Sequence, residues 1–149
     1  MNNPESEGLS ITGLRKSENR ARIFFSALHE AQTNYLFLLN LQEQDLLTGD
    51  SERLRLRQSQ EAALVQKISG LGAALAPILA VRGKAQWTAA LEDAGQLMSE
   101  ALVRQERNRK LAASRLNLIA GQIKQNRAAL ARAVRQHGLG DPGLVDIRV

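Results

Sequence analysis

The chain has 149 residues, a length that suits one folded domain, and its 44% of apolar residues includes only five aromatic side chains. Leu and Ala dominate together with Arg, Gln and Glu, a mixture that favours long helices over strands. The absence of cysteine excludes disulfides and thiolate chemistry and predicts a reducing compartment, the cytoplasm.

The net charge of +5 is unevenly distributed. Residues 1–100 carry 10 Lys and Arg against 12 Asp and Glu, whereas residues 101–149 carry 10 against 3. The basic carboxy-terminal third suits an acidic partner, either protein or nucleic acid. There is no secretion signal at the amino terminus and no uninterrupted apolar run near the ~20 residues of a membrane helix, so we expect a soluble protein without membrane insertion.

The first part of the chain predicts a leader and a long helix. Residues 1–10 have almost no apolar side chains and predict a disordered leader. Apolar residues at steps of three and four then predict a helix over about residues 12–47, with Tyr35 in its buried stripe. The sequence LLTGDSERL ends that helix, because Gly49 favours the left-handed conformation and Asp50 or Ser51 can cap the next helix. A tight turn between antiparallel helices is expected here.

A second helix is predicted over residues 51–76, where Arg57 and Glu61 interrupt the apolar stripe. Their spacing permits an ion pair between them or two solvated side chains. Pro77 removes a helical hydrogen bond, so the helix is expected to end or kink there. Residues 77–87 then form a connector, in which Trp87 either closes the end of the bundle or belongs to a docking surface.

The third predicted helix covers residues 88–136 and has a heptad-like, partly polar seam. As one helix it would be about 70 Å long, longer than a small domain is wide, so part of it should project, kink at Gly95 or Gly121, or pair with another chain. Glycines after residue 137 predict its end and a flexible tail over residues 138–149. The expected fold is all-α, an antiparallel bundle of three to four long helices with coiled-coil-like packing, with residues 11–137 as its single domain.

No motif indicates catalysis, a cofactor or a metal. His29 and His137 have no second ligand at a metal-binding spacing, and we expect both at the surface. The GLG sequences at 70–72 and 138–140 lack the rest of a phosphate-binding fingerprint. An enzyme is therefore the least supported class.

The basic stretch within residues 104–135 has two interpretations. It contains nine cationic residues against the single acid Glu106, and such charges bind nucleic acid by displacing counterions. However, the stretch has no aromatic residue for base stacking, and its charges lie on several helix faces. A solvated helix or a partner helix with acidic flanks fits the same residues. The cations are Arg104, Arg107, Arg109, Lys110, Arg115, Lys124, Arg127, Arg132 and Arg135.

The order of these features resembles the FlgN-type flagellar export chaperones over about residues 20–135. The matching sequences are the helix ending in LLTGD, the helix beginning SERLRLRQSQEAALVQKISGL, the loose connector and QERNRKLAASRLNLI, with an Asn-rich seam at Asn108, Asn117 and Asn126. The resemblance implies a cytoplasmic chaperone that binds the C-terminal amphipathic helices of hook-associated proteins. It also implies that the chaperone prevents their premature polymerisation and delivers them to the type III export gate.

The same resemblance implies that cargo contacts lie in the last helix and the tail. The partner-binding residues expected from it are Leu111, Leu116, Leu118, Ile119, Ile123, Leu130 and Val134, with polar positions Asn108 and Asn126. The sequence departs from expectation in having no tyrosine after Tyr35 to engage the export gate. Two alternatives stay open, namely a basic helical nucleic-acid-binding protein and a coiled-coil structural or adaptor subunit that self-associates, for instance as a dimer.

Overall fold

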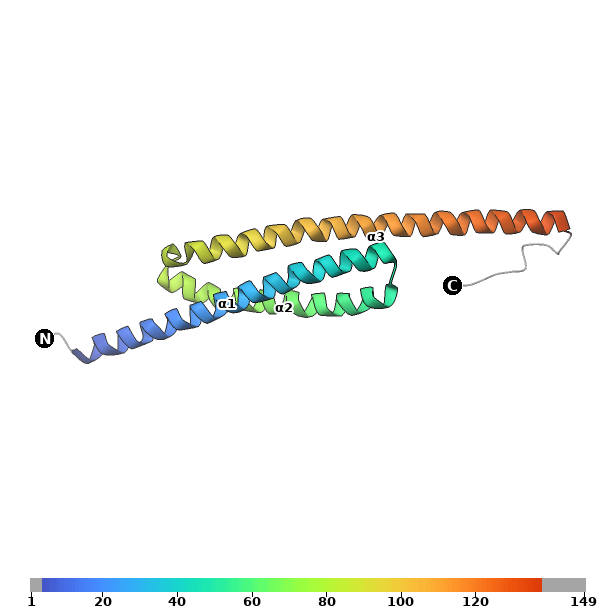
Figure 1. Ribbon diagram of the computed structural model, residues 1–149. Coiled ribbons are helices and arrows are strands. Elements are labelled where there is room, and N and C mark those ends of the chain that lie inside the picture. The colour runs from blue at the N-terminus through green and yellow to red at the C-terminus, as the bar shows by residue number, and fades with distance from the viewer. Residues whose placement is uncertain (1–3, 138–149) are drawn as a thin grey trace. The chain divides into compact units, whose positions relative to one another are not determined.

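The computed structural model describes residues 4–137, with side chains from residue 11 onward. The described residues are all-α, as predicted, and form the helices α1 (Pro4–Thr48), α2 (Ser51–Arg82) and α3 (Thr88–His137), with a 3-10 turn η1 (Ala85–Trp87) before α3 (Figure 1). The chain divides into two compact units, Met1–Arg109 and Lys110–Val149, and α3 contributes to both. Helix α3 is unbroken at both glycines expected as hinges.

Helix α1 begins at Pro4, so the described backbone of residues 4–10 is helical where the sequence predicts a leader. Proline suits the first turn of a helix, where its missing N–H has no intrahelical acceptor to lose. Residues 1–3 of the predicted leader and the predicted tail at 138–149 lie outside the described residues.

The turn between α1 and α2 is the one predicted at Gly49. Gly49 adopts φ 76°, and its N–H and that of Asp50 donate to the carbonyl of Asp45 at 2.9 and 3.1 Å. The Asp50 side chain then accepts a hydrogen bond from the Arg53 N–H at 3.0 Å. The left-handed glycine satisfies the end of α1 while the carboxylate caps α2, which confirms the predicted turn chemistry.

The predicted end of the second helix near Pro77 is wrong, because α2 continues through Pro77 to Arg82. Pro77 is exposed, so the carbonyl that loses its helical donor faces water and the cost of the proline falls. The helix ends instead at Gly83, which has φ 77° and donates to the Leu79 carbonyl at 2.9 Å. The connector expected over residues 77–87 is therefore reduced to Gly83, Lys84 and the turn η1.

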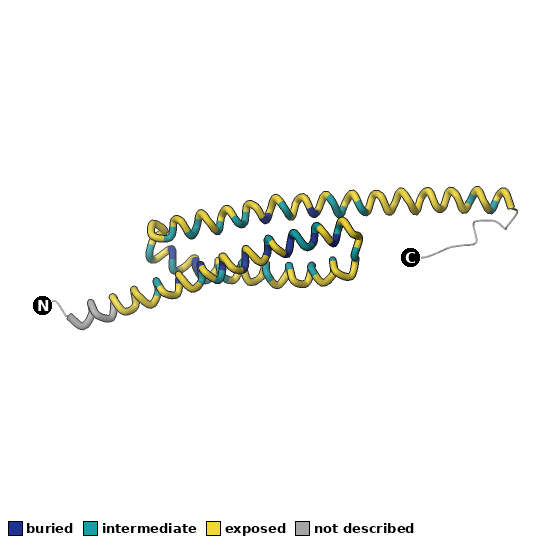
Figure 2. Tube along the Cα trace, in the orientation of Figure 1, coloured by how far each residue is buried: buried dark blue, intermediate teal, exposed yellow. Residues whose placement is uncertain are grey.

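The core of the first unit lies along α1, which contains most of the buried residues (Figure 2). One cluster joins α1 to the end of α2 and the start of α3, and Trp87 stacks on Phe25 there with ring centroids 5.2 Å apart. Trp87 closes the bundle end, the first of its two predicted roles. A second cluster contains Tyr35, Leu39 and Ala101, and it confirms Tyr35 as a core residue.

Within the first unit, α1 and α3 run parallel at a constant register. His29 contacts Asp93 at 2.7 Å, and Glu43 contacts Arg107 at 2.8 Å. Both pairs are 64 residues apart in sequence, since 93 − 29 and 107 − 43 each equal 64. The separation stays constant because α2 brings the chain back to the end where α1 starts, so that α3 runs in the same direction as α1. These polar pairs and the shared core fix how the two helices align.

The two charges that interrupt the α2 stripe do not pair with each other. The carboxylate of Glu61 accepts hydrogen bonds from the Tyr35 hydroxyl at 3.1 Å and the Gln42 amide at 2.7 Å. Arg57 instead donates through Nε to the Asp45 carboxylate at 3.3 Å. Both charges therefore point toward α1, because α1 supplies polar partners at the matching turns. The expected ion pair between Arg57 and Glu61 is therefore wrong, and so is the alternative of two solvated side chains.

We predict an alkaline loss of stability that depends on Tyr35. Burial, followed by the Glu61 carboxylate, raises the pKa of Tyr35 to about 12. A raised folded-state pKa means that the stabilisation is complete below pH 10 and declines as pH rises from about 10 to about 12. Because Tyr35 is the only tyrosine, tyrosinate absorbance reports this group alone. The Tyr35→Phe variant should lose that part of the pH dependence of unfolding, and Glu61→Gln should lower the titration midpoint. A midpoint near 10 in the folded wild type would contradict the buried contact.

Candidate functional site

A group of exposed apolar side chains in the second unit lies on α3. Leu116, Leu118, Ile119, Ile123 and Leu130 are all between 48% and 67% exposed, and every residue from 116 to 130 is exposed (Figure 2). Large apolar side chains are normally found singly at a surface, and a group of them marks an interaction site. This part of α3 is the candidate functional site.

Four of these apolar residues share one face of the helix with Val134. At about 100° per residue, Leu116, Ile119, Ile123, Leu130 and Val134 fall within an arc of about 60°. We call this set the exposed seam. Its members follow each other at steps of three, four and seven residues, the spacing of a coiled-coil seam, although Val134 is half-buried. The exposed seam can therefore pack lengthwise against another helix.

Four of the predicted partner-binding residues are not members of the exposed seam. Leu111 and Leu118 lie within about 20° of each other. Leu118 lies about 160° around the helix from Leu116. Asn108 is buried in the first unit, where its Nδ2 donates to the Leu39 carbonyl at 2.8 Å. Asn108 is thus a core residue that ties α3 to α1. Asn126 is exposed and lies about 20° from Ile119, at the edge of the exposed seam.

The cations predicted from the basic stretch fall into two groups. Three of them belong to the first unit and are paired there: Arg104 with Glu100 at 2.7 Å, Arg107 with Glu43 and Arg109 with Glu106 at 3.0 Å. The other six lie in residues 110–137, a range that contains no Asp or Glu. A third of these cations are thus paired locally, whereas the exposed seam lies in a stretch of purely positive charge.

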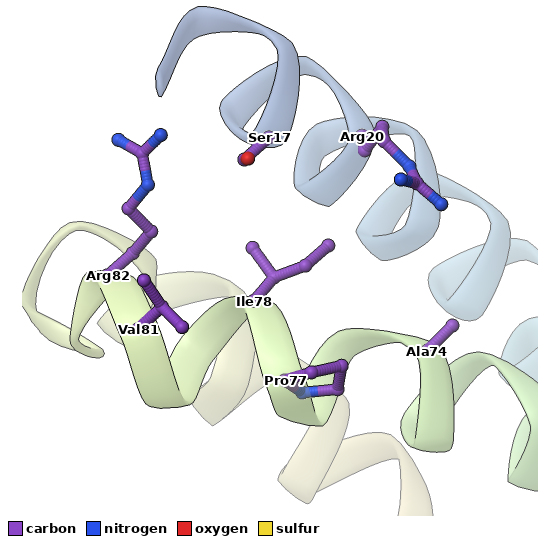
Figure 3. A pocket seen from close by; sticks show the side chains of 7 residues that line it. All are labelled: Ser17, Arg20, Ala74, Pro77, Ile78, Val81 and Arg82. Atoms are coloured by element: carbon purple, nitrogen blue, oxygen red, sulfur yellow. The ribbon is translucent and has the colours of Figure 1, made fainter. Parts of the chain in front are cut away.

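A second surface feature is a hollow between α1 and α2 in the first unit, with a volume of about 290 Å³ (Figure 3). Arg20 and Arg82 lie on either side of Ile78, and Val81 at its edge is 84% exposed. The hollow is slightly smaller than the ~300–1,000 Å³ typical of ligand pockets, and it is open. It arises where the short side chains of Ser17 and Ala74 leave the two helices incompletely packed.

Metal and membrane features were also sought in the part of the chain that the structure describes. No group of three His, Cys, Asp or Glu side chains gathers there. Helix α2 does contain a window of 18 residues that is long and apolar enough to cross a membrane, although the sequence predicts no such helix. The window arises because small apolar residues dilute its few charges, and only 6% of it is buried inside the structure. It is weak evidence for a membrane span.

Comparisons of the chain with protein-family models, with curated proteins and with solved structures gave no match. Sequence reasoning located the exposed seam by its periodicity but missed the role of Asn108. The only signal for Asn108 in the sequence was its position in the predicted heptad-like seam of residues 88–136, and exposed residues share that seam.

We predict that two asparagines of the same sequence seam differ in their contribution to stability. Asn108→Ala removes a buried hydrogen bond to the Leu39 carbonyl and should lower the free energy of unfolding by about 1 kcal/mol. The matched control Asn126→Ala changes an exposed residue and should be neutral or slightly stabilising, because alanine is the better helix former. Urea unfolding followed by circular dichroism measures both. Equal effects would show that Asn108 is not held in the core.

Proposed function

We propose that this protein is a cytoplasmic flagellar export chaperone of the FlgN type. Its exposed seam would cover the C-terminal amphipathic helix of a hook-associated protein, prevent premature polymerisation and release the cargo at the type III export gate. The single observation that supports this proposal best is the solvent exposure of Leu116, Ile119, Ile123 and Leu130 on one face of α3. An exposed heptad seam is half of a helix-in-groove or coiled-coil interface.

The two units suggest a division of labour within this proposal. The first unit contains the hydrophobic clusters and the polar pairs that hold α1, α2 and the start of α3 together. The second unit contains the apolar residues that are left uncovered. A stable scaffold that presents an uncovered helical surface suits a carrier whose cargo binding must be reversible. A cytoplasmic location belongs to the same proposal, and the lack of cysteine supports it.

Engagement of the export gate has no assigned residue. Tyr35 is the only tyrosine, and it is buried with its hydroxyl hydrogen-bonded to Glu61. A gate contact through an exposed tyrosine is therefore not part of this proposal. The predicted cargo contacts of the tail, residues 138–149, lie outside the described residues.

Acidic substitutions within the exposed seam should abolish cargo binding without unfolding the protein. Because Leu116 and Ile123 are exposed, the double variant Leu116→Asp/Ile123→Asp should keep the wild-type circular dichroism. It should lose about 100-fold or more in affinity for a hook-associated subunit, since apolar anchors dominate such interfaces. The matched control Leu118→Asp/Ala129→Asp adds the same charge to the other side of the helix and should bind nearly normally. The proposal fails if the wild-type protein binds no hook-associated subunit in calorimetry or co-purification.

Nucleic-acid binding is the second candidate, and it is favoured by the six cations and absence of acids in residues 110–137. If it were the function, affinity for duplex or single-stranded DNA would fall steeply between about 50 and about 200 mM salt. On the chaperone proposal we expect only weak binding that is similar for all nucleic acids. The Leu116→Asp/Ile123→Asp variant should weaken this binding only as much as its two added negative charges require. Tight binding with a steep salt dependence and no need for the exposed seam would favour this candidate over the chaperone.

A further inference from the structure

One charged side chain borders the exposed seam where its large apolar residues are interrupted. Between Ile123 and Leu130 the helix has no large apolar residue, and Asn126 and Arg127 occupy that level on opposite edges of the exposed seam. At about 100° per residue, Arg127 lies within about 20° of both Leu116 and Val134. Arg127 therefore lies about 20° beyond the edge of the exposed seam, with Ala120 about 20° farther round, so apolar residues flank it on both sides, whereas the other cations of residues 110–137 lie farther from the exposed seam.

Arg127 has no counter-charge of its own. The salt bridges of the described residues include those of Arg104, Arg107 and Arg109 on the same helix but none of Arg127. Residues 110–137 contain no carboxylate that a neighbouring turn could offer. The guanidinium is exposed, so water satisfies its five donors as long as the exposed seam is uncovered.

Covering the exposed seam with an apolar helix would remove that water. A guanidinium that is buried without a partner is costly, whereas a carboxylate can accept its hydrogen bonds in a bidentate arrangement. A single polar layer within an apolar seam also fixes register, because every other alignment leaves the charge unpaired. The position of Arg127 thus selects both the chemistry and the alignment of the helix that binds here.

We propose that Arg127 is the specificity-determining residue of the exposed seam, and that its partner is an amphipathic helix with an aspartate or glutamate inside its own apolar seam. This inference rests on the proposed function, because it names the partner chemistry of the same surface. Lys124 and Arg135 lie about 60° and 80° from Arg127 on one flank of the exposed seam. Their charges attract an acidic helix over a longer distance, but they do not face the apolar seam of the bound helix.

The test uses the full chain and three labelled, designed helical peptides with leucine seams. The first has glutamate at its central seam position, the second has that glutamate moved to the solvent face with leucine in its place, and the third has lysine at the central seam position. The first two have equal net charge, so they separate seam pairing from overall attraction. Fluorescence anisotropy measures each affinity for the wild type, for Arg127→Glu and for Arg132→Glu.

The matched control Arg132→Glu makes the same charge change about 140° around the helix, where Arg132 donates to the Ala128 carbonyl at 3.3 Å. The wild type should prefer the seam-glutamate peptide to the seam-lysine peptide by about tenfold or more. Arg127→Glu should reverse this preference and restore binding of the lysine peptide. Arg132→Glu should weaken binding of both acidic peptides while the order of preference stays unchanged.

Three results would overturn the inference. These are equal binding of the seam-glutamate and solvent-glutamate peptides, an equal change of preference in the Arg127 and Arg132 variants, and failure of all three peptides to bind a protein that binds a hook-associated subunit. All three leave the chaperone proposal intact. Failure of the subunit itself to bind counts against the chaperone proposal instead, so the two failures are distinguishable.

Discussion

Burial of α1 is the constraint on which the first unit depends. Ala21, Ala31 and Leu39 of this helix are almost wholly inaccessible to solvent, and α2 and α3 each contribute only a few buried residues of their own. Two helices therefore complete their cores on a third. Because α1 provides the common surface, its polar residues also decide the register, through Asp45 and Gln42 toward α2 and through His29 and Glu43 toward α3.

Local chemistry was predictable from the sequence, and the reason is that it needs no distant partner. The turn at Gly49 and Asp50 is determined by a backbone conformation and a cap, each confined to a few residues. The extent of α2 was not predictable, because the cost of Pro77 depends on whether its face of the helix meets water or protein. Likewise, the partners of Arg57 and Glu61 lie on another helix, where sequence spacing gives no information.

The candidate site shows the same limit more clearly. Periodicity places Asn108, Ile119 and Ile123 in one predicted seam, yet Asn108 is buried and the two isoleucines are about half exposed. A helical repeat identifies which residues share a stripe but not which part of the stripe another element covers. Charge has a similar ambiguity, since Arg104, Arg107 and Arg109 belong to the same basic stretch of the sequence as the later cations, yet in the structure they have carboxylates beside them.

The location of Trp87 has a practical consequence for spectroscopy. It is the only tryptophan, Tyr35 is the only tyrosine, and both belong to the first unit. The second unit therefore contains no ultraviolet chromophore other than its peptide bonds. Near-ultraviolet signals of this protein report on the bundle end and its interior alone. In a complex formed through residues 110–137, any new aromatic signal would originate in the bound molecule or in a response of the first unit.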